Sequence, residues 1–194
     1  MLNPWVLPSL CLLLIFTSYP SIFPFSETYL LMMLGVIFTF SALLPIISIF
    51  TLYTSRIIKN YRLEIGTDRM IAMLITTVYY AILTFLVIDK IGAMLLISAI
   101  VIAFALATAF VTMLAPFYSA CPSSTSAGAV LGTLFAVNLL FEEYNLLLPI
   151  AVGILMTGSL ISIRLYLNQQ TLNETVVGFS IGFFTCLFTV FYFG

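Results

Sequence analysis

The chain has 194 residues, of which 63% are hydrophobic and only 7% are charged. Because a soluble domain carries about 25% charged residues, this composition excludes an ordinary soluble protein and indicates an integral membrane protein. The formal net charge of −1 argues against nucleic acid as a partner. A helix crosses a bilayer with about 20 apolar residues, so we expect one transmembrane domain over residues 1–194, an all-α polytopic bundle with six or seven spans.

Seven apolar blocks, separated by charges, prolines and small polar clusters, are the predicted helices. In chain order they cover residues 3–19, 28–54, 70–88, 91–115, 125–141, 145–166 and 175–193. The first block is short, so it is either a first span or a retained hairpin arm that re-enters the membrane, and not a removed signal peptide. Pro45 is expected to kink the second helix. The links at Asp89-Lys90 and Glu142–Asn145 are predicted to be short turns.

Three polar segments follow every second block, at residues 55–69, 116–124 and 168–174. If every block crosses the membrane, these three segments share one membrane face and can converge into one site. The first segment holds four of the six basic residues, Arg56, Lys59, Arg62 and Arg69. A basic side chain costs about 3 kcal/mol at a bilayer centre, so this cluster is expected at a water boundary or in a polar cavity.

Two further patterns indicate packing. Gly128 with Gly132, and Gly178 with Gly182, form Gly-x-x-x-Gly pairs that let transmembrane helices approach closely. The three cysteines, Cys11, Cys121 and Cys186, are far apart and show neither a metal-binding spacing nor a disulfide framework. We therefore predict no metal site and no cofactor.

The three polar segments also carry a set of ordered motifs. Arg62 and Arg69 have six residues between them, Pro122-Ser123-Ser124-Thr125 follows, and Arg164 is followed by Gln170, Glu174 and Gly178. This order resembles the signature of the type 2 phosphatidic acid phosphatase superfamily, which reads Lys-x6-Arg-Pro, Pro-Ser-Gly-His and Ser-Arg-x5-His-x3-Asp. The resemblance covers nearly the whole chain and is closest to the short, divergent bacterial branch.

The chain departs from that signature at several positions. Arg62 stands for the lysine, and Met70 replaces the proline of the first motif. Thr125 and Gln170 stand at the two histidines. In the third motif, Ser162 lies one residue further from the arginine than the family serine.

The departures remove the chemistry that the resemblance implies. In that family one histidine attacks phosphorus, the other protonates the leaving group, and an aspartate, here Glu174, orients the nucleophile. The carboxamide of Gln170 is not a useful nucleophile and the hydroxyl of Thr125 is too weak an acid, whereas imidazole suits both tasks. The chain has no histidine that could take over.

The groups that would hold the phosphate are retained. Arg62, Arg69 and Arg164 match basic positions of the motifs, and arginine binds phosphate oxygens in a bidentate manner. Ser123 and Ser124 are expected at a helix N-terminus, which suits an anion. The resemblance thus predicts a phosphate cradle without the catalytic pair.

Simpler interpretations stay open for these residues. Arg62 and Arg69 can be ordinary interfacial arginines that face lipid head groups, and the segment 123–125 can be only a helix cap. Arg164 lies inside an apolar helical stretch, so a partner is expected for it, either Glu174 or a bound anion.

We therefore predict a catalytically silent membrane protein with the phosphatase-like fold, which binds a lipid phosphate or serves as a subunit or scaffold of a membrane complex. One alternative is a lipid phosphatase or phosphotransferase with non-standard residues, working through Thr125 or a metal, although Glu64, Asp68 and Glu174 are few and scattered. Another is a small transporter or flippase, against which the helices show few buried charges.

The expected partners are membrane lipids, with a possible membrane-protein partner, and the expected location is the bacterial cytoplasmic (inner) membrane. Two observations predict opposite orientations of the chain in the membrane. The excess of basic residues on the site-bearing face favours a cytoplasmic site. Resemblance to the bacterial phosphatases favours the opposite side.

Overall fold

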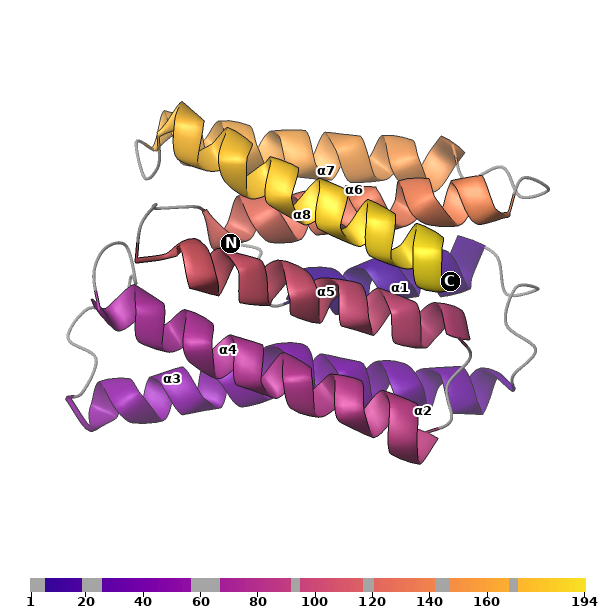
Figure 1. Ribbon diagram of the computed structural model, residues 1–194, viewed down its shortest axis with the longest axis horizontal. Helices are drawn as coiled ribbons and strands as arrows, with labels where there is room; N and C mark the ends of the chain where they lie inside the picture. The colour runs from indigo at the N-terminus through magenta and orange to yellow at the C-terminus, as the bar shows by residue number, and fades with distance from the viewer. Residues whose placement is uncertain are drawn as a thin grey trace.

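The computed structural model describes residues 6–18, 26–56, 67–91, 95–116, 121–141, 147–167 and 171–194, and every element in these ranges is helical (Figure 1). The elements are α1 (Leu7–Ser18), α2 (Glu27–Phe38), η3 (Thr39–Leu43), α3 (Leu44–Thr54), α4 (Thr67–Leu86), η4 (Val87–Ile91), α5 (Leu95–Leu114), α6 (Pro122–Leu140), α7 (Leu147–Tyr166) and α8 (Leu172–Phe193).

Six helical stretches in the described part of the chain are long and apolar enough to cross a membrane. They are Thr28–Thr54, Met70–Asp89, Leu95–Leu114, Pro122–Leu140, Leu147–Tyr166 and Leu172–Phe193. The all-helical architecture predicted from the composition is confirmed, and the chain is compatible with a multi-pass integral membrane protein.

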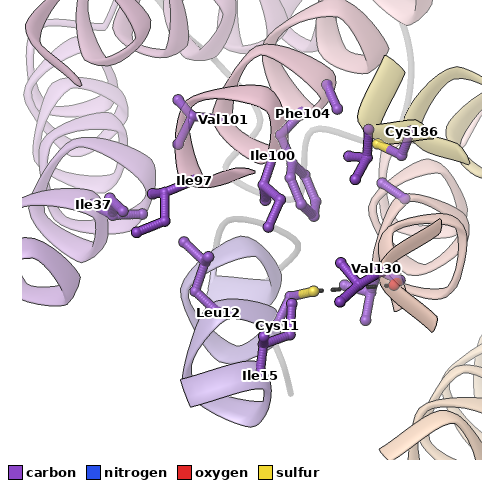
Figure 2. Packing of buried hydrophobic residues seen from close by; sticks show 14 of the residues in the cluster. Cys11, Leu12, Ile15, Ile37, Ile97, Ile100, Val101, Phe104, Val130 and Cys186 are labelled. Carbon is purple, nitrogen blue, oxygen red and sulfur yellow. Dashed lines mark hydrogen bonds between the residues drawn. The ribbon is translucent and has the colours of Figure 1, made fainter. Parts of the chain in front are cut away.

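The first helix, α1, differs from these six. Its 12 residues give a length of about 18 Å, well short of the roughly 30 Å hydrocarbon core of a bilayer. Its Leu7, Cys11, Leu12 and Ile15 are buried in the main core. Figure 2 shows Leu12 and Ile15 together with Ile97 and other core residues of α5. The role of α1 is therefore to fill the interior of the bundle.

The centre of the bundle is α6, which packs against α8, α5, α7 and α1. It is also the most buried of the six long helices, and its sequence is rich in Gly, Ala, Ser and Thr. Small residues allow neighbouring backbones to approach closely in a membrane, where apolar area alone gives no preference for helix contact over lipid contact. The least hydrophobic long helix thus becomes the core helix.

The glycine pairs join α6 to α8 and confirm the predicted packing role. Along α6, Gly128 and Gly132 lie directly against the backbone of Phe179 and Phe183. Along α8, Gly178 lies against the backbone of Cys121, where an added Cβ would be 2.7 Å from the carbonyl oxygen. The contacts advance in the same direction along both helices, so α6 and α8 run parallel.

The predicted second helix, residues 28–54, is confirmed as one helical stretch, but it contains the π-helical turn η3. Other predicted boundaries are wrong. The tight turn predicted at Asp89-Lys90 is instead part of the π-helical turn η4, because charged residues do not by themselves end a helix and Lys is a good helix former. The fifth and seventh predicted helices begin three residues earlier than predicted, at Pro122 and Leu172.

Candidate functional site

The helix ends that flank the three polar segments lie at one end of the bundle. Figure 1 shows the starts of α4, α6 and α8 and the ends of α3, α5 and α7 together on the left of the view. Within this end, the residues of the described helices that were predicted to bind phosphate or to replace catalytic groups lie on α4, α6, α7 and α8, and side chains are described for those of α6, α7 and α8.

The start of α6 is capped by Cys121, for which the sequence predicts only a packing role. Its Sγ accepts a hydrogen bond from the Ser124 amide at 3.3 Å and lies 2.9 Å from the Ser123 hydroxyl. Pro122 occupies the first helical turn, where its missing N–H costs nothing. Ser123 and Ser124 are therefore inside the first turn of α6, and both are buried.

The start of α8 is held by a capping box. The Thr171 hydroxyl accepts a hydrogen bond from the Glu174 amide at 3.4 Å, and the Glu174 carboxylate accepts one from the Thr171 amide at 3.2 Å. The sequence signal for this arrangement was the spacing Thr-x-x-Glu. Because the carboxylate offsets the positive end of its own helix, α8 attracts an anion less strongly than α6 does.

The two starts are joined directly. The amide of Cys121 donates to the Glu174 carbonyl oxygen at 3.3 Å, and Gly178 lies against Cys121 one turn further along α8. Two parallel helix N-termini therefore lie side by side. The amides of Cys121, Ser124, Thr171 and Glu174 are used in these contacts. Pro122 has no amide hydrogen, so the first-turn amides that still need an acceptor outside the helix are those of Ser123, Leu172 and Asn173.

Thr125 has a packing role in this arrangement. Its hydroxyl donates to the Cys121 carbonyl oxygen at 2.9 Å, and its side chain is only 3% exposed. It faces Gly178 and Gly182 of α8. These contacts do not favour Thr125 as a nucleophile or as a proton donor, since the hydroxyl is already used and closed off by α8.

Arg164 lies in the last turn of α7, on the side that faces α6. Gly153 of α7 rests against the side chains of Leu131 and Leu134 of α6. α6 and α7 run in opposite directions (Figure 1), so from this contact the end of α7 and the start of α6 lie toward the same end of the bundle. Arg164 lies eleven residues after Gly153, and Ser123 lies eleven residues before Leu134. Arg164 is therefore level with the start of α6.

Two further observations concern the surroundings of Arg164. It follows the buried Thr157 by two helical turns, so it shares the face that packs on the bundle, and it is half-buried. No ion pair joins it to Glu174 in the described part of the chain, because the Glu174 carboxylate bonds to the start of its own helix.

The remaining predicted residues are less well placed. Arg69 belongs to the first turn of α4. Four residues later, Met73 packs in a small cluster with Val111 and Ile181, so this end of α4 adjoins α5 and α8. The Arg69 side chain, Arg62 and Gln170 lie outside the described residues. The convergence of all three arginines stays a prediction.

Comparison of the chain with protein-family models, with curated proteins and with solved structures gives no match. The described residues contain no group of three or more His, Cys, Asp or Glu side chains that could hold a metal ion. What the site offers chemically is therefore a few first-turn backbone N–H groups, at Ser123, Leu172 and Asn173, and one half-buried guanidinium, that of Arg164.

Proposed function

We propose that this protein binds the phosphate group of a membrane lipid at the joined starts of α6 and α8, without hydrolysing it. The observation that carries the proposal is that Arg164 lies level with the start of α6 and on the face of α7 that packs against it. A guanidinium beside a helix N-terminus provides charge-assisted and backbone hydrogen bonds to the same anion.

The proposal includes a fold and a location. In this proposal the chain is a divergent relative of the type 2 phosphatidic acid phosphatases and lies in the cytoplasmic membrane of a bacterium. The order of the three motifs and the six apolar helices support it. Catalytic silence follows from chemistry, since the chain has no histidine and the Thr125 hydroxyl is bonded to the backbone. A lipid-binding protein of this kind can also serve as a subunit of a larger membrane complex.

The experiment is a titration of the purified protein with short-chain phosphatidic acid, and calorimetry measures the binding affinity. In Arg164→Gln the ligand loses a charged hydrogen-bond donor, so we expect binding to weaken by about tenfold or more. The matched control is Arg56→Gln, because Arg56 is an exposed arginine at the end of α3, at the same end of the bundle.

The expected result is a large loss of affinity for Arg164→Gln and a change of less than about twofold for Arg56→Gln, since exposed charges contribute little. Equal losses in both variants would mean that general surface charge attracts the lipid. Unchanged affinity in Arg164→Gln would rule out the proposed site.

A further inference from the structure

The long second span is interrupted by a π-helical turn at its middle. In η3 the amide of Leu44 bonds to the carbonyl oxygen of Thr39, five residues earlier. Pro45 follows at once, and it has no N–H for the carbonyl oxygen of Ser41, four residues before it. The π turn is thus a local response to Pro45, and π turns inside α-helices are rare and occur frequently at functional sites.

Ser41 is the unusual residue of this turn. Its side chain is fully buried, and its hydroxyl has no hydrogen-bond partner among the described residues. The neighbouring hydroxyls behave differently: Thr39 donates to the Gly35 carbonyl oxygen and Thr51 to that of Ile47, each at 2.7 Å. In a regular α-helix the Ser41 hydroxyl could bond in the same way to the carbonyl oxygen four residues earlier. The π turn therefore contains a buried hydroxyl without a partner among the described residues.

The π turn also decides which residues of α2 face the core. The buried positions Met33, Ile37, Ser41, Pro45 and Ile49 are each four residues apart. In an uninterrupted α-helix a step of four residues advances by about 400°, so the first and last of them would lie about 160° apart. The extra residue of the π turn corrects much of this drift and holds both halves of the span against the bundle.

An uninterrupted helix would bring different residues of α2 to the core. Leu31 and Phe38 precede Ile49 by five and about three whole turns of an α-helix, respectively, so they would share its face. In the structure they are 69% and 40% exposed. Figure 2 shows the residue that they would displace, Ile37, pointing to the core beside Ile97 of α5.

We propose that η3 is a conformational joint, at which α2 rotates by about 100° relative to α3 when the π turn changes to a regular α-helix. Each state has features that stabilise it. The π state buries Met33 and Ile37 and spares Pro45 a clash, whereas the α state gives the Ser41 hydroxyl a backbone partner. Because Met33 and Ile37 belong to the core cluster that contains Leu12 of α1, the rotation changes which side chains of α2 pack beside α1 and which face outward.

The variants that test the joint act in opposite directions. Pro45→Ala restores the missing amide and removes the ring, which favours the α state. Ser41→Ala removes the unsatisfied hydroxyl, which favours the π state. Deletion of Ala42 removes the extra residue, so a regular helix then keeps the observed faces and the joint is lost.

The measurement is oxygen accessibility of a spin label at Leu31, in a background with Cys11→Ala, Cys121→Ser and Cys186→Ala. We expect the protected fraction of the label to grow by about tenfold in Pro45→Ala, the change that one buried hydrogen bond produces. It should fall in Ser41→Ala and vanish in the deletion variant.

A second label at Leu155, which is 73% exposed on α7, should stay accessible in every variant and reports whether the fold is intact. Accessibility at Leu31 that is the same in Pro45→Ala, in Ser41→Ala and in the deletion variant, with the Leu155 label unchanged, would overturn the joint. So would protection at Leu31 in the deletion variant.

Discussion

Gly182 is the position where the packing of α6 on α8 is most sensitive to one added methyl group. A Cβ there would lie against the carbonyl oxygen of Thr125 and 2.9 Å from the amide nitrogen of Ala129. Both neighbours are helix backbone, which cannot move aside as a side chain can. Gly182→Ala is therefore expected to push α8 away from the start of α6.

The matched control is Gly158→Ala on α7, where an added Cβ meets nothing within 4 Å. Overpacking costs about 1–3 kcal/mol, whereas alanine for glycine at an open helical site gains about 0.4–1 kcal/mol. We therefore expect the free energies of unfolding of the two variants to differ by about 1.5–4 kcal/mol, with Gly182→Ala the less stable.

Unfolding by SDS in mixed micelles, followed by circular dichroism, measures this difference. Gly182→Ala should also bind phosphatidic acid more weakly, because the two helix starts would separate, while Gly158→Ala should bind normally. Equal stability of the two variants would refute the close α6–α8 contact on which the site depends.

Three other predictions concern the caps and the orientation. Cys121→Ala should lower the free energy of unfolding by about 1 kcal/mol because the Ser124 amide loses its acceptor, whereas Cys121→Ser should retain the cap; thermal denaturation compares them. Arg56 has a φ of 59°, a left-handed conformation that favours glycine, so Arg56→Gly should raise the unfolding midpoint by an amount equivalent to about 1 kcal/mol. For orientation, an impermeant maleimide in intact cells should label a single cysteine at Phe193 and leave one at Ser55 unlabelled if the site is cytoplasmic; the reverse pattern would support the family orientation.

The helical blocks and their packing could be predicted from the sequence because composition and glycine spacing act locally. A run of about 20 apolar residues has few alternatives in a membrane, and the Gly128–Gly132 and Gly178–Gly182 pairs have a direct geometric meaning. That α6 would be the central helix could also have been inferred, since it is the long helix richest in small residues.

The details at the helix starts were harder to predict. Cysteine is not among the preferred caps, so the sequence predicts a polar break, and not a helix start, at Cys121-Pro122. The spacing of Thr171 and Glu174 fits a capping box, whereas the motif resemblance predicts that Glu174 replaces a catalytic aspartate. The structure gives its carboxylate a local capping role.

The π turn could not be derived from the sequence alone. Pro45 predicted a kink, but whether the chain answers a proline with a bend or with a π turn depends on which faces of α2 and α3 must be buried. That requirement comes from the packing of Met33 and Ile37 in the core. It is a tertiary constraint that the local pattern does not contain.

The proposed function has two parts: a lipid phosphate binds at the starts of α6 and α8, and it is not hydrolysed there. Phosphorus NMR of short-chain phosphatidic acid, recorded over time with the purified protein and with Arg164→Gln, tests both halves at once. We expect the lipid resonance to shift or broaden with the wild-type protein and to stay unchanged with Arg164→Gln, and we expect no growth of an inorganic phosphate signal. A resonance that the wild-type protein leaves unchanged, or an inorganic phosphate signal that grows with time above a detergent blank, would contradict the proposed function.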